Sequence, residues 1–329
     1  MNINKDAFLI EDLSKAEKAP TRDGYGKGLV DLGEKDERVV VLCADLAEST
    51  RSHWFKEKFP DRYIEIGVAE QNLAAIASGL ANYGKIPFIS SYAVFSPGRN
   101  NEQIRTTISL SILPVKIAGA HAGVSVGPDG ATHQALEDIA LMRVQPNMTV
   151  VVPCDAIETR KATIAISDCC AGPAYLRFGR EKSPIFTTEK TPFQIGKAIV
   201  LREGNDATIV GCGMLLYNAL VAAEELSKEG IEVAVINSHT VKPLDVETIL
   251  NSVKKTKAVV SVEEHQIAGG LGSAVAEALS QNFPAPQEFI GIRDRFGKSG
   301  ETDELIEAFG MGSKSIKEAV KKVIKRKSK

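Results

Sequence analysis

Short apolar runs alternate along the chain with longer stretches of helical periodicity. In the first half these runs cover residues 38–43, 86–92, 114–119, 148–153 and 174–178. Runs that are apolar throughout, rather than at every second position, are typical of strands buried on both faces. Because helical stretches separate the runs, the pattern predicts a parallel sheet covered by helices on both sides.

A second unit repeats this pattern after residues 181–192, a charged stretch that carries two prolines and lacks periodicity. Its apolar runs cover residues 207–213, 231–237 and 258–264, and a helix through Leu220 and Leu226 joins the first two. This βαβ order predicts a compact domain of its own. The expected fold class is therefore α/β, with two domains that are each a mainly parallel sheet flanked by helices. We expect the first domain over residues 1–186, a linker over 187–192 and the second domain over 193–329.

Composition excludes several classes of protein. The 329 residues are 43% hydrophobic and carry a net charge of −2, which is typical of a globular protein and offers no basic surface for nucleic acid. The sequence shows neither a long apolar run nor a signal peptide, so we expect no membrane contact and a cytoplasmic location. The five cysteines form no Cys-x-x-Cys pair, so we expect a reduced compartment and no metal site on this chain.

Glu70 is an acid among small and apolar residues. It lies in the stretch 67–81, directly after a strand-like run at 62–66, so we expect it near the N-terminus of a buried helix. A buried carboxylate is costly without a dedicated partner. Two interpretations remain open: free backbone N–H groups and the helix dipole satisfy Glu70, or it has a functional partner.

A glycine-rich loop at residues 119–134 follows a predicted strand and precedes a helix. It holds His121, Asp129 and His133. Open α/β sheets place their ligands at the carboxyl ends of strands, which makes this loop a candidate site. The loop is neither a G-x-G-x-x-G dinucleotide motif nor a P-loop, since no Gly-Lys-Ser/Thr follows. A flexible loop with exposed histidines is the alternative.

Six short motifs, in one order along the chain, resemble the transketolase family. They are Ile-Gly-Val-Ala-Glu-Gln-Asn around Glu70, Asp-Gly-Ala-Thr-His-Gln around His133, Arg-Val-Gln-Pro-Asn-Met at 143–148, Cys154-Asp155, residues 172–180, and residues 262–265 followed by 269–273. The first five resemble the pyrimidine-binding domain of that family, and the sixth resembles its C-terminal domain. The resemblance therefore covers nearly the whole chain.

One family motif is missing. Transketolases bind thiamine diphosphate and Mg²⁺ through a separate N-terminal domain with a Gly-Asp-Gly motif, and this chain has no such motif. The resemblance thus implies the C-terminal subunit of a transketolase split into two chains, active only with an N-terminal partner subunit that carries Gly-Asp-Gly and holds most of the cofactor and metal. It also implies an α2β2 heterotetramer. The reaction implied is the transfer of a two-carbon ketol unit between ketose and aldose phosphates, as in the pentose phosphate pathway.

The resemblance assigns cofactor contacts to three residues. Glu70 would hydrogen-bond N1′ of the aminopyrimidine and favour the tautomer whose nitrogen takes the proton from C2 of the thiazolium ring. Tyr92 and Phe95 match aromatic positions that pack on the aminopyrimidine, with core packing as the alternative. Pro97-Gly98 stands where the family commonly has a third aromatic residue, so we expect a different pocket wall there.

The resemblance also assigns substrate contacts. His133 and Asp129 match positions near the reacting carbon of the sugar, and His133 is the second expected catalytic residue, because neutral imidazole both donates and accepts. The positions that match contacts to the distal phosphate are Arg22, Ser49, His121 and Arg180. Arginine suits phosphate because its planar fork offers paired donors. A surface role is the alternative for Arg22.

Glu263, Glu264 and His265 end a predicted strand of the second unit. Adjacent residues of a strand point to opposite faces, so the two acids cannot both bind one metal ion. We expect a structural or subunit-contact role for them. We also expect a helix packed closely on the sheet after Gly269-Gly270.

Other functions remain open at this stage. A deoxyxylulose-phosphate synthase resembles residues 67–71 as well, but it usually has Asp-Arg where this chain has His121-Ala122. The β subunit of a 2-oxoacid dehydrogenase shares the architecture, but the pattern at residues 129–134 argues against it. A regulatory paralogue without activity would not need the candidate residues together. The sequence does not tell which sugar phosphates are preferred, the exact oligomeric state or the identity of the partner chain.

Overall fold

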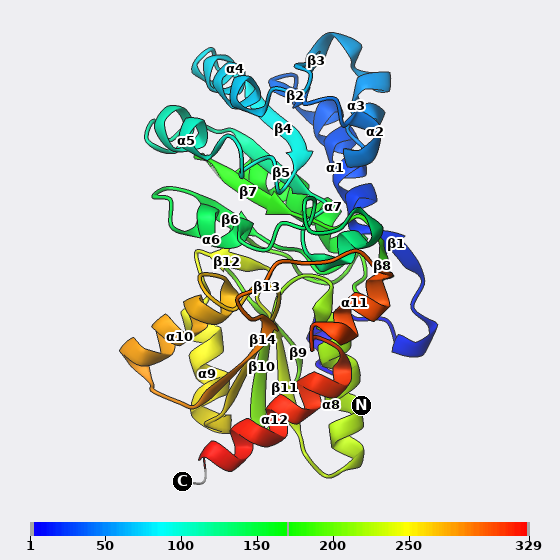
Figure 1. Cartoon of the computed structure of the whole chain (residues 1–329), viewed down its shortest axis with the longest axis vertical. Coiled ribbons are helices and arrows are strands. Elements are labelled where there is room, and N and C mark those ends of the chain that lie inside the picture. Colours follow the sequence, from blue (N-terminus) through cyan, green and yellow to red (C-terminus); the bar gives the residue numbers. More distant parts are fainter. Residues whose placement is uncertain (1–2, 170, 328–329) are drawn as a thin grey trace.

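The chain forms two sheets that lie one above the other along the long axis of the molecule (Figure 1). The computed structural model describes residues 3–169 and 171–327. The strand order is β12-β6-β7-β5-β4-β2-β3 in the first sheet and β14-β13-β10-β11-β9 in the second. No helix in these two ranges is long and apolar enough to cross a membrane.

Six parallel strands make up most of the first sheet: β2 (Val39–Cys43), β3 (Tyr63–Glu65), β4 (Ile86–Tyr92), β5 (Lys116–Ala120), β6 (Thr149–Val151) and β7 (Ala174–Arg177). One face is covered by α1 (Thr21–Lys35), α3 (His53–Lys58) and α7 (Ala156–Cys169), and the other by α4 (Glu70–Asn82) and α6 (Asp138–Arg143). Val41 of β2 packs with the first group of helices, and Leu42 packs with the second. Because both faces are buried, the strands are mainly apolar, and the strands predicted for this half are confirmed.

The second sheet has four parallel strands and one antiparallel edge strand: β10 (Ala207–Gly211), β11 (Val233–Asn237), β13 (Val259–Gln266) and β14 (Gln287–Ile292), with β9 (Ile199–Arg202) at the edge. One face is covered by α9 (Val246–Thr256) and α10 (Leu271–Asn282), and the other by α8 (Leu215–Lys228), α11 (Thr302–Ala308) and α12 (Ser313–Lys327). The predicted two-domain α/β fold is confirmed, and α10 is the helix expected after Gly269-Gly270.

Each unit contributes a short segment that hydrogen-bonds to the other unit. Strand β12 (Thr240–Lys242) comes from the second unit but pairs antiparallel with β6 at the edge of the first sheet. In return, the N–H of Asn4 donates to the carbonyl of Leu201 in the second unit at 3.0 Å. Strands β1 (Lys18–Pro20) and β8 (Lys182–Pro184) form a separate antiparallel pair. The predicted limits of the two domains and of their linker therefore stay a prediction.

The adjacent acids in β13 point in opposite directions. The carboxylate of Glu263 accepts the N–H groups of Leu271 at 2.7 Å and Gly272 at 2.8 Å, at the start of α10. The carboxylate of Glu264 crosses to the first domain and accepts the N–H of Ser125 at 2.5 Å. The expected structural role of these acids is confirmed. Within the described ranges, no group of three or more His, Cys, Asp or Glu side chains could hold a metal ion.

A buried acid, Glu158, joins the two domains. Its Oε2 accepts the N–H of Cys154 at 2.7 Å, and its Oε1 accepts Nδ2 of Asn237 in β11 at 2.7 Å. Burial, and then repulsion from Asp155, raises the pKa of Glu158 to about 7. Oδ1 of Asn237 is buried without a hydrogen-bond partner. A flip of that amide would let Oδ1 accept the proton of a protonated Glu158.

We expect the free energy of unfolding to fall as the pH rises from about 4.5 to about 7, because the unfolded chain releases the Glu158 proton first. Each pH unit in this window costs roughly 1.4 kcal/mol, so the loss totals about 3 kcal/mol. Glu158→Gln cannot ionise and should remove this slope. Urea unfolding at pH 4.5 to 8 measures the difference between the two proteins. An equal slope in both would contradict the assignment of the raised pKa to Glu158.

Candidate active site

The candidate residues gather at the carboxyl ends of four neighbouring strands in the first sheet. The strands are adjacent in the order β7-β5-β4-β2. Ser49 follows β2 in α2 (Ala47–Thr50), Tyr92 ends β4, His121 follows β5, and Arg180 follows β7. Parallel strands end at one edge of the sheet, which is why residues so far apart in sequence lie in one region.

Arg22, in the first turn of α1, contacts Ser49 and His121. Its Nη1 donates to the backbone carbonyl of Ser49 at 3.0 Å and lies 3.3 Å from Nε2 of His121. Burial, and then the charge of Arg51, lowers the pKa of Arg22, whose Nε is buried without a hydrogen-bond partner. An arginine in this setting does not fit the alternative of a plain surface role.

His121 is a neutral imidazole within this group. Burial lowers its pKa to about 3, with a smaller contribution from the charge of Arg22. Its ring stacks on that of Tyr92 with 4.1 Å between centroids. Its Nδ1 is buried without a hydrogen-bond partner. Its Nε2 lies 3.2 Å from the backbone carbonyl of Ser49, so this nitrogen is the one that faces the other predicted phosphate-binding residues.

Arg180 and Asp129, both predicted to contact substrate, are bonded to each other. Nη1 of Arg180 donates to Oδ1 of Asp129 at 2.8 Å. The charge of Arg180 nonetheless contributes to the lowered pKa values of Arg22 and His121. The residues predicted to bind the distal phosphate thus form two groups: Arg22, Ser49 and His121 contact one another, and Arg180 is bonded to Asp129.

Tyr92, Phe95 and His133 form an aromatic cluster beside His121. The rings of Tyr92 and Phe95 are stacked, with centroids 5.9 Å apart and 19° between planes. The ring of His133 meets them edge-on, 6.0 Å from Tyr92 and 5.6 Å from Phe95. All three side chains are partly exposed, so core packing alone does not account for them. Such a cluster can hold a flat ring.

Glu70 is the first residue of α4, and its side chain is 1% exposed. Its Oε2 accepts Nη1 of Arg99 at 2.9 Å, and the side chain of Asn100 donates to its backbone carbonyl at 3.0 Å. The partner shown for the carboxylate is therefore a side chain, rather than the free N–H groups that helix capping would use. Arg99 also lies over the ring of Phe95, 5.1 Å from its centroid, which connects Glu70 with the aromatic cluster.

Sequence reasoning missed two arginines of the site, Arg99 and Arg51. Arg51 pairs with Asp23 at 2.7 Å and contributes to the lowered pKa of Arg22. An acid at the start of a buried helix signals the need for a cation. Nothing in the sequence marks a residue 29 positions from Glu70 as that cation.

The departure from the family pattern at Pro97-Gly98 has a structural reason. A Cβ at Gly98 would lie 2.0 Å from the carbonyl oxygen of Val94. No side chain fits at this position unless the loop moves. The close approach of the loop to Val94 therefore leaves no room for an aromatic side chain at Gly98.

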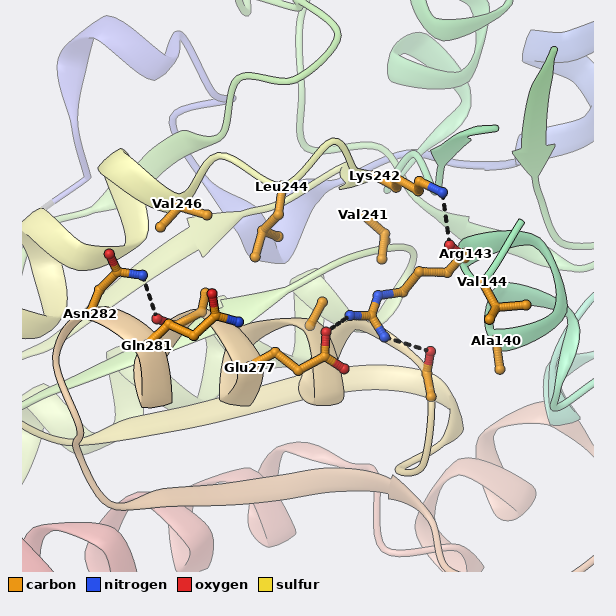
Figure 2. A pocket seen from close by; sticks show the side chains of 13 residues that line it. Ala140, Arg143, Val144, Val241, Lys242, Leu244, Val246, Glu277, Gln281 and Asn282 are labelled. Atoms are coloured by element: carbon orange, nitrogen blue, oxygen red, sulfur yellow. Dashed lines mark hydrogen bonds and ion pairs between the residues drawn. The ribbon is translucent and has the colours of Figure 1, made fainter. Parts of the chain in front are cut away.

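A groove of about 730 Å³ lies between the domains, and none of the predicted site residues lines it (Figure 2). Figure 2 shows the two cations of the groove, Arg143 and Lys242, turned toward protein partners. Nη2 of Arg143 donates to Glu277, and Nζ of Lys242 donates to the backbone carbonyl of Arg143 at 3.0 Å. Because Arg143 is paired with a carboxylate and Lys242 already donates to backbone carbonyls, the groove does not call for a charged ligand.

Two family profiles match the chain. The one described as "Transketolase, pyrimidine binding domain" matches residues 17–184. The one described as "Transketolase, C-terminal domain" matches residues 196–316. Together they cover both sheets of the fold.

Individual proteins give the same result. The chain is 42% identical to the 6-deoxy-6-sulfo-D-fructose transketolase subunit SqwH of Clostridium sp. (strain MSTE9) over 316 residues, which are 95% of this chain and 97% of that protein. It is 37% identical to the transketolase of Homo sapiens over 312 residues, which are 94% of this chain but 49% of that protein. The solved structure titled "Split gene transketolase, inactive beta4 tetramer" matches with a TM-score of 0.88 and 45% identity, over 94% of this chain and 99% of that one. The chain thus has the length of the split relatives and about half the length of the human protein.

Proposed function

Because this chain belongs to the transketolase family and corresponds to its C-terminal section, we propose that it forms one half of a two-chain transketolase. With an N-terminal partner chain, it transfers a two-carbon ketol unit from a ketose phosphate to an aldose phosphate. The observation that carries the proposal is the paired arrangement of buried Glu70 beside the aromatic cluster and of His121 beside Arg22. The first arrangement suits a cofactor ring, and the second suits the anionic end of a sugar.

The partner chain supplies the rest of the cofactor site in this proposal. It holds the diphosphate and the Mg²⁺, for which this sequence has no Gly-Asp-Gly motif. The assembly is an α2β2 heterotetramer in the cytoplasm. The related solved structure is titled an inactive tetramer of β chains, which agrees with a chain of this kind being inactive without its partner.

The residues around Glu70 fit the aminopyrimidine ring of thiamine diphosphate. Tyr92 and Phe95 offer partly exposed rings, and Glu70 offers a carboxylate that is buried beside them. Thiamine diphosphate, when bound, supplies the carbon nucleophile that carries the two-carbon unit. Glu70 would hold a proton against a nitrogen of the ring, and its burial strengthens that hydrogen bond. When the ring nitrogen binds Glu70, Arg99 would either keep its ion pair with the Glu70 carboxylate or lose it.

His133 and Asp129 hold the sugar near the reacting carbon. His133 lies at the edge of the aromatic cluster, next to the place proposed for the cofactor ring. A neutral imidazole can donate to a sugar oxygen and accept from a hydroxyl, which suits a group whose protonation changes during transfer. Asp129 accepts Nη1 of Arg180 with Oδ1 and offers its other oxygen to a further hydroxyl of the sugar.

The distal anion of the sugar lies between Arg22 and Arg180. Arg51 and Arg180 both contribute to the lowered pKa of Arg22, so three arginines lie near one another here, with Asp23 paired to Arg51 and Asp129 to Arg180. An anion bound here would relieve that repulsion and take the paired donors of the guanidinium groups. The related SqwH subunit is named for a sugar with a sulfonate at its end, so the anion varies among relatives.

Arg180→Ala tests this function in the two-chain complex. Losing a charge-assisted contact costs about 1.5–3 kcal/mol, so kcat/KM for a ketose phosphate should fall roughly ten- to hundredfold. The loss should appear chiefly in KM, because the contact is far from the reacting carbon. Hydroxypyruvate has no distal phosphate, and its steady-state kinetics should change little. His121→Ala should separate the two donors in the same way.

Arg38→Ala is the matched control. Arg38 is an exposed arginine that is paired with Asp36 at 2.7 Å, and its loss should leave both donors unaffected. Equal damage to both donors in Arg180→Ala would mean that Arg180 supports the fold or the cofactor instead. A wild-type complex that transfers no ketol unit from any sugar phosphate would contradict the proposed function itself.

A further inference from the structure

The glycine-rich loop that holds Asp129 and His133 is built against the second domain. We call residues 123–134 the substrate loop. Gly123 has a φ of 88°, a conformation that favours glycine. A Cβ at Gly123 would lie 2.3 Å from the carboxyl group of Glu264 in the second domain. No side chain would fit between the loop and that carboxyl group.

Glu264 anchors the start of the substrate loop. Its Oε1 accepts the N–H of Ser125 at 2.5 Å, and its Oε2 accepts the Ser125 hydroxyl at 3.1 Å. Glu264 is itself held by Arg177, whose Nη2 donates to the Glu264 backbone carbonyl at 2.8 Å. Nε of Arg177 donates to the buried carboxylate of Asp138 at 2.7 Å. The anchor is therefore part of a buried and fully paired network with little freedom to move.

Further contacts from the second domain hold the rest of the substrate loop. Nε2 of Gln134 donates to the carbonyl of Lys298 at 3.0 Å and to that of Gly127 at 3.3 Å. The hydroxyl of Thr302, at the start of α11, donates to the carbonyl of Ser125 at 3.0 Å. The second domain thus holds the loop near both of its ends. Glu264 and Thr302 hold Ser125, and the carbonyl of Lys298 holds Gln134.

We infer that Glu264 is a positioning residue for ketol transfer: by holding Ser125, it fixes the substrate loop so that Asp129 and His133 meet the sugar. The inference rests on the proposed function, in which those two residues contact the substrate. Without this anchor the loop would populate other conformations. A substrate that binds only the ordered loop would then bind more weakly, in proportion to the ordered fraction. The second domain therefore takes part in substrate binding through the first.

Glu264→Ala in the two-chain complex tests the inference, with a ketose phosphate as donor. We expect KM to rise roughly tenfold or more and kcat to change by less than about threefold, because saturating substrate selects the ordered loop. The Kd of thiamine diphosphate should stay unchanged, since Glu70 lies outside the loop. A merely structural role would lower the folded fraction, and hence kcat per total protein, without raising KM.

Glu263→Ala is the matched control. Glu263 is the neighbouring buried acid, but its carboxylate caps α10 within the second domain, so its loss should lower the Tm and leave KM unchanged. Glu264→Gln should bring KM to within about threefold of wild type, because the amide can accept the Ser125 N–H and donate to the rotated Ser125 hydroxyl. Ser125→Ala removes one of the two hydrogen bonds, and its smaller rise in KM serves as the test where Glu264→Ala does not fold.

Amide hydrogen exchange adds a readout that needs no activity. In the isolated chain, the N–H groups of residues 125–127 and 129–133 should exchange faster in Glu264→Ala than in Glu263→Ala. A KM within about twofold of the wild-type value in Glu264→Ala overturns the inference, even where exchange rises. His133→Ala separates this outcome from the proposed function. Unchanged kinetics in His133→Ala would contradict the substrate role of the loop itself, whereas a large loss there with none in Glu264→Ala contradicts only the anchor.

Discussion

Replacing Glu70 with glutamine is expected to lower the turnover of the two-chain complex by roughly 10²–10⁴-fold, the usual contribution of a positioned general acid or base. Glutamine keeps the shape of the side chain but loses the charge-assisted hydrogen bond to the cofactor ring. Glu70 is 1% exposed, and this bond is strong because it forms away from water. The readouts are hydrogen–deuterium exchange at C2 of the thiazolium ring and the steady-state rate, with assembly of the complex unchanged.

Arg99→Gln is the matched control for Glu70→Gln. Arg99 is the cation that Glu70 contacts at 2.9 Å, so both variants remove the same ion pair. The proposed function requires Glu70 but requires Arg99 only as a neighbour, so Arg99→Gln should cost far less turnover. Similar losses in both variants, with unchanged exchange at C2, would mean that Glu70 serves the ion pair and the helix start rather than the cofactor.

The pattern of apolar runs was enough to predict most of the fold. The central strands of both sheets are buried on both faces, so their sequences are mainly apolar rather than apolar at every second position. The edge strands β9, β12 and β14 were not predicted. Strand β12 has three residues and lies where the second unit crosses to the first sheet, and no local pattern records such a pairing.

The sequence predicted individual residues of the site but not the residues that hold them in place. Motifs identified Glu70 and His133 because each lies in a short characteristic segment, whereas His121 was singled out by the glycine-rich loop that follows a strand. Arg99 and Glu264 show the limit of this reasoning. Arg99 contacts Glu70 from 29 residues away, and Glu264 contacts Ser125 from 139 residues away. The strand pattern correctly predicted that Glu263 and Glu264 point apart, but only the folded chain shows what each one reaches.

Calorimetric titration with thiamine diphosphate and Mg²⁺ tests most directly whether the cofactor site is shared between two chains. The chain alone should bind the cofactor weakly and show no ketol transfer, because it offers the ring contacts of Glu70, Tyr92 and Phe95 but no motif for the diphosphate. The same titration with a partner chain that carries Gly-Asp-Gly should show tight, saturable binding and activity. Tight binding by the chain alone would contradict the division of the site between two subunits.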